Sequence, residues 1–254
     1  LVATFDPHPA TLFRPDAPPF ALTRLDQKLD LFAGFGIDAT VVIPFNTALA
    51  ALTAQSFVGD WLHARIGAGV AVSGADFTFG TKRSGNTALL AELGQGHGFA
   101  AEVVHAVSDS GGVISSTRIR EALRDGEVAA ATALLTRPFA IRGEVQHGAK
   151  LGRTLGFPTA NLVLGAYLRP RFGVYAVRAR LADGTHVGGV ANLGIRPMIE
   201  PPVELLETFL FDWAGDLYGQ TIDIELVEFL RPEWKLDGLD ALKAQIAVDS
   251  DNAR

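Results

Sequence analysis

The stretch Gly152-Arg-Thr-Leu-Gly-Phe-Pro-Thr-Ala-Asn-Leu162 concentrates residue types that bind phosphate and constrain the main chain. Arg153 offers a planar guanidinium group that suits phosphate oxygens, and Gly152 and Gly156 allow a ligand to approach the backbone closely. Pro158 fixes the φ angle of the chain near the end of the stretch. This combination predicts a nucleotide-binding segment, although glycine, proline and asparagine are also the common residues of a loop between two strands.

Two side chains at the end of the same stretch offer oxygen atoms to a cation. Thr159 and Asn161 are two residues apart, so they project to the same side of an extended segment. Mg²⁺ prefers oxygen ligands, and it commonly takes only one or two of them from the protein and the rest from phosphate and water. We therefore expect Thr159 and Asn161 to hold a magnesium ion that accompanies a nucleotide.

The residues around this stretch follow the pattern of an all-β domain. Strand-like segments are separated by turns such as Ala182-Asp-Gly184, with no helix between them. Sequential strands of this kind predict a closed antiparallel β-barrel. A final helix is expected over Gly238–Ala247, where Leu239, Leu242 and Ile246 have helical spacing, and it should pack against the barrel. The expected strands are Phe139–Val145, Gly173–Leu181, His186–Leu193, Leu205–Phe211 and Thr221–Leu230.

The first half of the chain instead alternates strands with helices. Such alternation predicts an α/β domain with a parallel sheet, in which ligands bind at the carboxyl ends of the strands. The expected strands are Leu1–Phe5, Ala39–Ile43, Val70–Ser73 and Ala101–Ala106. The expected helices are Arg24–Phe35, Ala54–Gly67, Thr87–Leu93 and Thr117–Leu135, the last interrupted near Asp125-Gly126.

The change of pattern places the domain boundary at Arg137-Pro138, which gives an α/β domain of residues 1–136 and a barrel domain of residues 137–254. The apolar, β-prone opening at Leu1 is typical of a strand that arrives from an earlier helix. We therefore expect a strand and a helix to precede the printed sequence.

Composition limits the class of protein and its partners. The 254 residues, 48% apolar and 20% charged, are enough for one large domain or two ordinary ones. The net charge of −6, with no run of Lys or Arg, argues against a nucleic acid or an anionic membrane as the main partner, so small-molecule substrates are expected. The lack of cysteine excludes disulfides and thiolate metal sites and fits a cytoplasmic protein. The apolar runs are too short to span a membrane.

From about Arg137 to its end the chain resembles riboflavin kinase, whose Gly-Phe-Pro-Thr-Ala-Asn signature stands at residues 156–161. The whole chain resembles the bacterial bifunctional riboflavin kinase/FAD synthetase family. This resemblance implies a Rossmann-like nucleotidyltransferase domain followed by a riboflavin kinase barrel. It also implies ATP as co-substrate, Mg²⁺ as cofactor, and riboflavin, FMN and FAD as substrates and products.

The kinase resemblance implies contacts in the loop before the opening stretch. In the family the corresponding loop covers the nucleotide, so Gly148, Lys150, Gly152 and Arg153 are the expected nucleotide contacts. A glycine-containing loop can direct several backbone N–H groups at one phosphate. The alternative for Lys150 is an ordinary solvated side chain.

Phosphorylation of a hydroxyl group also needs a carboxylate to accept its proton, and the strand beginning at Val203 offers Glu204 and Glu207. Strand alternation puts Glu207 on one face with Phe209 and Phe211. A carboxylate on an apolar face is costly without a partner, whereas Glu204 at the exposed start of the strand can be structural. The resemblance places the catalytic base at Glu207, in agreement with the pattern.

Further residues are implied by the family's other motifs. Phe172 and Tyr175 are candidates for flavin contact, with plain core packing as the alternative. In the first half, Ser116, Thr117 and Arg118 of Ile114-Ser-Ser-Thr-Arg-Ile-Arg120 are expected to hold ATP phosphates at a helix N-terminus. A simple helix cap is the compatible alternative there.

Two motifs at the ends of predicted strands supply further flavin candidates, His8 in Thr4-Phe-Asp-Pro-His-Pro9 and Asp76 in Gly74-Ala-Asp-Phe-Thr-Phe-Gly80. His8 could equally be a turn residue. The family's first nucleotide signature, a His-x-Gly-His element, does not occur among the histidines of this sequence. If the sequence is complete we expect no FAD synthesis, and if it is part of a longer protein we expect both reactions. The rivals are a riboflavin kinase with a degenerate first half and a non-catalytic flavin-binding module.

Overall fold

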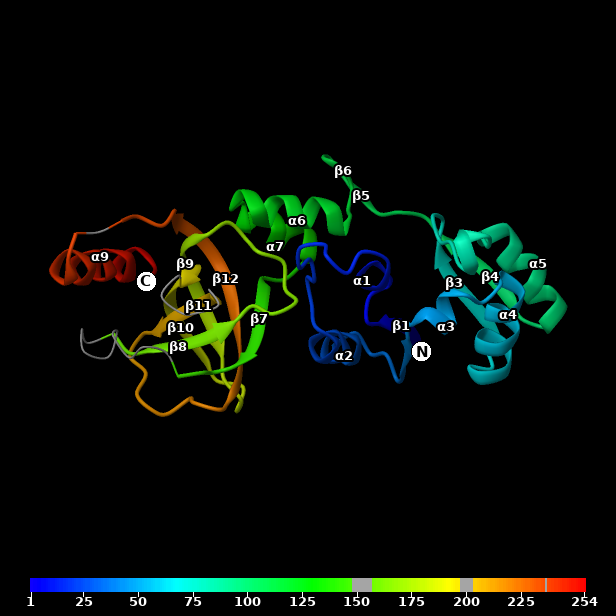
Figure 1. The fold of residues 1–254 in the computed structure, drawn as a ribbon, viewed down its shortest axis with the longest axis horizontal. Coiled ribbons are helices and arrows are strands. Elements are labelled where there is room, and N and C mark those ends of the chain that lie inside the picture. The colour runs from blue at the N-terminus through cyan, green and yellow to red at the C-terminus, as the bar shows by residue number, and fades with distance from the viewer. Residues whose placement is uncertain (148–156, 197–202, 236) are drawn as a thin grey trace. The chain divides into compact units, whose positions relative to one another are not determined.

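The computed structural model describes residues 1–147, 157–196, 203–235 and 237–254, which fold into two compact units (Figure 1). One unit consists of Leu1–Ala17 and Lys28–Ile114, and the other of Pro18–Gln27 and Ser115–Arg254. Each unit has its own core of buried apolar side chains.

The first unit contains two pairs of parallel strands. β1 (Val2–Asp6) pairs with β2 (Thr40–Pro44), and β3 (Val70–Gly74) pairs with β4 (Ala100–Val104). The observed elements confirm the predicted alternation of strands and helices. The remaining elements of residues 1–114 are α1 (Pro9–Phe13), α2 (Leu25–Gly34), α3 (Thr47–Ala50), α4 (Ala54–Ser56), η1 (Phe57–Arg65), η2 (Thr81–Arg83), α5 (Thr87–His97), β5 (Ser108–Asp109) and β6 (Gly112–Val113).

Polar caps determine where two helices of this unit begin. The side chains of Asn46 and Asn86 each accept a hydrogen bond of 2.9 Å from a main-chain N–H in the first turn of α3 and α5. Such caps satisfy N–H groups that have no partner within the helix. The single helix expected from residue 54 is instead the short α4 followed by the π-helix η1, which buries Phe57 in the core of the unit.

The second unit is built around an antiparallel sheet of six strands. Their spatial order is β7 (Phe139–Glu144), β12 (Thr221–Arg231), β9 (Gly173–Arg180), β10 (His186–Arg196), β11 (Val203–Leu210) and β8 (Thr159–Val163). The chain beyond β7 meets β8 where the N–H of Gln146 donates to the carbonyl oxygen of Asn161 at 2.9 Å. The sheet is therefore a barrel joined at one end of its edge strands, rather than the fully closed barrel expected from the sequence.

The edge strand β8 was predicted only as an extended segment and not as a member of the barrel. It has five residues, and its inward side consists of Ala160 and Leu162, which are buried in the core. Thr159 and Asn161 lie on the other side, as predicted. Five residues with two polar members fit a loop as well as a strand, so the pairing with β11 could not be read from local sequence.

The two sides of the barrel wall have different surroundings. The inner side forms the main core, which includes Leu206, Leu210 and Tyr175. On the outer side a smaller cluster of Val174, Val190 and Phe211 packs with Ala253, the residue that follows α9 (Leu239–Asn252). Figure 1 shows α9 beside the barrel, as predicted. No helix within the described ranges is long and apolar enough to cross a membrane.

Helices α6 (Ser116–Asp125) and α7 (Val128–Leu135) precede the barrel and pack on its core. Ile119, Leu123, Val128 and Ala131 are the buried residues of these two helices. The break between them falls at Gly126, which has a φ of +81° that favours glycine. The predicted interruption near residue 125 is therefore confirmed.

A buried polar network ties the segment Pro18–Gln27 to the barrel. The hydroxyl of Tyr167 donates to Oε1 of Gln27 at 2.5 Å, and Nε2 of Gln27 donates to the carbonyl of Ala140 at 3.2 Å. Asp223 accepts two hydrogen bonds from Arg142, at 2.8 and 3.1 Å, and another from Arg180. Burial alone would raise the pKa of Asp223, but the two guanidinium groups outweigh it and hold the pKa below its usual value.

We predict that Asp223→Ala lowers the free energy of unfolding by about 3–5 kcal/mol, because it leaves the guanidinium of Arg142 buried without its carboxylate. The Arg142 side chain is only 13% exposed. Glu225→Ala, two residues along the same strand, removes the more exposed pair with Arg178 and should cost about 0–1 kcal/mol. Urea denaturation of the two variants measures this difference. Equal losses in the free energy of unfolding would contradict the stabilising role of the buried Asp223 carboxylate.

The same network predicts that the free energy of unfolding depends on pH. A carboxyl whose pKa is lowered in the folded state stabilises the fold above the unfolded pKa, about 3.9 for Asp, and this contribution is lost as the pH falls through the folded pKa. The stability gap between the wild type and Asp223→Ala should therefore narrow on acidification.

Candidate functional site

Strand pairing brings Glu207 between two asparagine residues. Glu207 of β11 stands directly opposite Asn161 of β8 on one side and Asn192 of β10 on the other. Residues opposite each other in antiparallel strands point to the same face, with Cβ atoms about 4.5–5.5 Å apart. The three side chains therefore form one row, here called the Asn–Glu–Asn row, on the outer side of the barrel.

Aromatic side chains border the row on β11. Phe209 stands opposite Thr159, and its ring meets those of Phe157 and Phe211 edge-on at 5.1 and 5.9 Å between centroids. These contacts confirm the predicted face of Glu207, Phe209 and Phe211. The row thus has polar groups with an apolar, aromatic border, which suits a ligand that has both a ring system and polar substituents.

The oxygen of the Asn161 side chain has no protein donor. Asn161 is 4% exposed, and among the described residues its Oδ1 finds no hydrogen-bond partner. A buried acceptor without a partner is costly, and such atoms generally meet a water, an ion or a ligand. Thr159 lies on the same side of β8, two residues away. The oxygen donors therefore fit a hard cation such as Mg²⁺.

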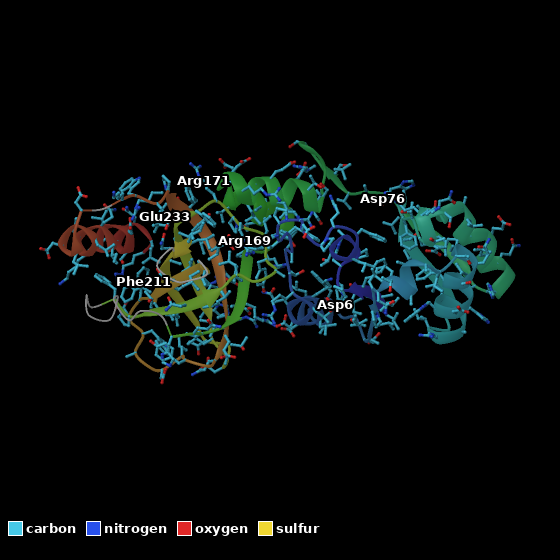
Figure 2. The ribbon with its side chains drawn as sticks, in the orientation of Figure 1. Asp6, Asp76, Arg169, Arg171, Phe211 and Glu233 are labelled. Atoms are coloured by element: carbon cyan, nitrogen blue, oxygen red, sulfur yellow. The ribbon has the colours of Figure 1, made fainter. Side chains whose placement is uncertain are left out.

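The structure distinguishes the two carboxylates considered on β11. Glu204 accepts a hydrogen bond of 2.6 Å from Nε of Arg169, whose Nη1 also donates to the carbonyl of Gly165 at 2.7 Å. Glu204 is therefore engaged in an ion pair that fastens the loop before β9, and Figure 2 labels Arg169 there. Glu207 is the carboxylate that shares a face with Asn161.

Four predicted nucleotide contacts, Gly148, Lys150, Gly152 and Arg153, lie outside the described residues. The residue just before them, His147, contacts Tyr218, with ring centroids 3.8 Å apart and ring planes tilted by 34°. Tyr218 belongs to the turn after β11, where Gly219 has a φ of +76°. Within this turn, Leu217 is buried in the core.

The two predicted flavin contacts near β9 differ in their placement. Tyr175 is fully buried in the barrel core, and its hydroxyl donates to the carbonyl of Arg171. Burial raises the pKa of this phenol. This placement favours the core-packing alternative for Tyr175, because alternation along β9 turns its side chain inward. Phe172 is partly buried against the same core and keeps some exposed surface.

The residues predicted for adenylyl transfer do not lie in one compact unit. Ser116, Thr117 and Arg118 begin α6 in the second unit, and Ser115, one residue earlier, caps the helix by accepting from the N–H of Arg118 at 3.3 Å. The capping alternative thus belongs to Ser115. The hydroxyl residues Ser116 and Thr117 are exposed in the first turn.

The remaining two candidates belong to the first unit. His8 is exposed, and its Nδ1 accepts from the N–H of Ala10 at 3.1 Å as the cap of α1. Asp76 is exposed and lies just after β3, and Figure 2 labels it. Both therefore follow the carboxyl ends of parallel strands, where ligands bind in such sheets.

Asn192 and Glu233 were not predicted from the sequence. Asn192 lies near the end of the expected strand His186–Leu193, and Nδ2 of its side chain donates to Oε1 of Glu233 at 3.0 Å. A polar residue within a strand between Ala191 and Leu193 was the available signal for Asn192. Nothing in the local sequence connects Glu233 with β10.

Comparison with known proteins identifies both halves. A family model described as riboflavin kinase matches residues 135–254, and one described as FAD synthetase matches residues 1–118. The chain is 42% identical to the bifunctional riboflavin kinase/FMN adenylyltransferase of Escherichia coli strain K12, over all of this chain and 81% of that protein. It is 36% identical to the protein of the same name from Listeria monocytogenes, again over all of this chain and 81% of that protein.

A solved structure shares the fold of the whole chain. The macrolide-efflux protein from Streptococcus pneumoniae superposes with a TM-score of 0.84 and 31% identity, over 98% of this chain and 81% of that one. The fold and the matches define a two-part enzyme class with a parallel-stranded α/β half and an antiparallel barrel half. The chain belongs to the bifunctional riboflavin kinase/FMN adenylyltransferase family.

Proposed function

We propose that this chain serves flavin cofactor biosynthesis through two reactions. Residues 137–254 transfer the γ-phosphoryl group of ATP to riboflavin, giving FMN and ADP. Residues 1–136 transfer the adenylyl group of a second ATP to FMN, giving FAD and pyrophosphate. The family membership supports both reactions. The observation that carries the kinase assignment is the Asn–Glu–Asn row, in which Glu207 adjoins the unpartnered oxygen of Asn161. Because both reactions consume ATP, the proposed location is the cytoplasm.

Glu207 is the proposed catalytic base of the kinase reaction. It accepts the proton of the terminal ribityl hydroxyl as that oxygen attacks the γ-phosphorus, and the bond to the β-phosphate oxygen breaks to release ADP. A carboxylate is suited to this task because, when ionised, it has only acceptor sites. The rings of Phe209 and Phe211, 5.9 Å apart between centroids, lie on the same face as this carboxylate.

Thr159 and Asn161 are the proposed protein ligands of Mg²⁺. The ion supplies neutralisation of the charge on the phosphate oxygens. Support comes from the buried Oδ1 of Asn161, which lacks a donor among the described residues. The proposed contacts of the nucleotide are the two Mg²⁺ ligands, Thr159 and Asn161, and four residues of the preceding loop: Gly148, Lys150, Gly152 and Arg153.

For the other proposed contacts, Phe172 remains the flavin candidate of the kinase half, and His8 and Asp76 those of the adenylyltransferase half. Ser116, Thr117 and Arg118 are the proposed phosphate contacts in adenylyl transfer. A helix N-terminus offers free N–H groups and a favourable dipole for such an anion.

The proposal predicts the flavin products of the chain. Incubation with riboflavin, ATP and Mg²⁺, followed by separation of the flavins, should give FMN in step with ADP, and FAD in step with pyrophosphate. FMN alone would favour the rival with a degenerate first half, and would agree with a need for the His-x-Gly-His element. A chain that binds riboflavin but forms neither FMN nor FAD would favour the rival hypothesis of a non-catalytic flavin-binding module.

We predict that Glu207→Gln lowers kcat for FMN formation by about 10²- to 10⁴-fold, because an amide cannot accept the hydroxyl proton. The matched control is Glu204→Gln on the same strand, which can still accept a hydrogen bond from Arg169 and should stay within about twofold of the wild type. Steady-state assays at saturating riboflavin and ATP measure both. A Glu207→Gln enzyme that turns over at the parent rate would refute the assignment of the base.

Asn161→Ala should raise the Mg²⁺ concentration needed for half-maximal FMN formation, by about tenfold, because one proposed ligand is lost. Val163→Ala, which has a partly exposed side chain on the same side of β8, is the control for local packing. Titration of the rate with Mg²⁺ at fixed ATP distinguishes the two variants. Equal Mg²⁺ dependence of Asn161→Ala and the wild type would exclude Asn161 as a ligand.

A further inference from the structure

The side chain of Asn192 is held in one orientation by Glu233. Its Nδ2 donates to Oε1 of Glu233 at 3.0 Å. An ionised carboxylate only accepts hydrogen bonds, so the amide must present its nitrogen and not its oxygen to Glu233. The Oδ1 atom of Asn192 is thereby turned away from Glu233, and it has no hydrogen-bond partner among the described residues.

Glu233 reaches this position because residue 194 is a glycine. A β-carbon placed on Gly194 would lie 2.7 Å from Cδ of Glu233 and 2.8 Å from its Oε2, closer than β-carbons approach other heavy atoms in proteins. The carboxylate therefore lies directly over the main chain of β10, two residues from Asn192. Gly194 does not have a positive φ, so its role is to leave space.

The chain just before Glu233 is anchored by α9. Arg231 forms two hydrogen bonds with Asp249 of that helix, at 2.8 and 2.6 Å, and the Asp249 side chain is 5% exposed. The guanidinium of Arg231 also lies 4.5 Å from the ring of Trp234. Figure 2 shows Glu233 in this region of the barrel wall. Glu233 is therefore presented to β10 by a fixed segment.

Two amide groups thus stand on either side of the proposed base. Asn161 and Asn192 are the cross-strand neighbours of Glu207. The Oδ1 atom of Asn161 has no donor among the described residues, and the Oδ1 atom of Asn192 is turned away from Glu233. Cross-strand neighbours are about 4.5–5.5 Å apart at Cβ, so a short polyol can reach Glu207 and Asn192 together. The ribityl chain of riboflavin is such a polyol, and each of its hydroxyl groups can donate one hydrogen bond.

We propose that Oδ1 of Asn192 accepts a hydrogen bond from a ribityl hydroxyl next to the one that is phosphorylated, and that Glu233 is a positioning residue that keeps this oxygen turned toward the substrate. The inference rests on the proposed kinase function of the Asn–Glu–Asn row. It makes Asn192 a determinant of substrate specificity.

Four variants test the proposal: Asn192→Ala, Glu233→Ala, Gly194→Ala and Glu233→Gln. The first should raise KM for riboflavin about tenfold, the value of one hydrogen bond, and should change kcat by less than about twofold. Glu233→Ala should likewise raise KM for riboflavin. Gly194→Ala should match Glu233→Ala, because its methyl group displaces the flexible carboxylate. Glu233→Gln should restore the wild-type KM, because its amide oxygen can still accept from Asn192.

The matched control is Glu228→Ala, an exposed carboxylate of β12 outside the row, which should behave as the wild type. Because Glu233 acts through Asn192, the double variant Asn192→Ala/Glu233→Ala should be no worse than Asn192→Ala. 4′-Deoxyriboflavin lacks the neighbouring hydroxyl. The wild type should bind this analogue more weakly than riboflavin, whereas Asn192→Ala should bind the two compounds about equally. Thermal melting of each variant separates these effects from loss of fold.

Riboflavin binding by quenching of its fluorescence gives a readout that does not depend on turnover. Weaker binding in Asn192→Ala, Glu233→Ala and Gly194→Ala, together with wild-type binding in Glu228→Ala, supports the proposal. Wild-type KM and binding in Gly194→Ala, or a loss in kcat alone, would overturn it. A wild-type chain that binds riboflavin but makes no FMN would instead defeat the proposed function. These two failures are therefore distinguishable.

Discussion

The register of β11 between β8 and β10 is the constraint on which the proposed kinase site depends. Leu206 and Leu210 point into the barrel core, and this fixes Glu207 and Phe209 on the outer side. A slip of one residue would turn every side chain of the strand to the opposite face. It would bury the carboxylate of Glu207 and expose two leucines, each worth about 1.5–3 kcal/mol when buried. The hydrophobic core therefore positions the polar row without any contact to the row itself.

The same constraint explains why the site is assembled from distant parts of the chain. The spatial order β10-β11-β8 differs from the order in sequence, so residues near 160, 192 and 207 become neighbours. Asn161 has a further role, because its carbonyl oxygen accepts the hydrogen bond from Gln146 that joins the edges of the barrel. One residue thus contributes its main chain to closure and its side chain to the proposed cation site. Glu233 is added from beyond β12, and the Arg231–Asp249 ion pair makes its position depend on the C-terminal helix.

Much of this architecture could be predicted because the signals are local. The helices and most strands follow from apolar spacing and turn residues, and the face of Glu207 follows from strict alternation along β11. The inward turn of Tyr175 obeys the same alternation, but an aromatic residue suits either a core or a ligand site, so its sequence does not decide the face. β8 was missed because a five-residue edge strand is defined by its partner. The contact of Glu233 with Asn192 spans 41 residues and depends on the space above a glycine. Long-range contacts of this kind are set by packing and not by local pattern.

The chemistry of the row also indicates what kind of ligand it can hold. Glu207 and Glu233 are carboxylates, and the two asparagine oxygens are acceptors, so the row presents acceptor atoms to its surroundings. A surface of acceptors favours ligands that bring donors or positive charge, and riboflavin with Mg²⁺ brings both, as hydroxyl groups and as a cation. ATP alone would be repelled, because its phosphates carry the same sign of charge as the carboxylates. The cation therefore has to accompany the phosphates to the row, and the hydroxyl to be phosphorylated approaches the acceptors as a donor. An acceptor-rich row next to an aromatic border thus suits the hydroxyl groups and ring system of a flavin and the cation that accompanies ATP.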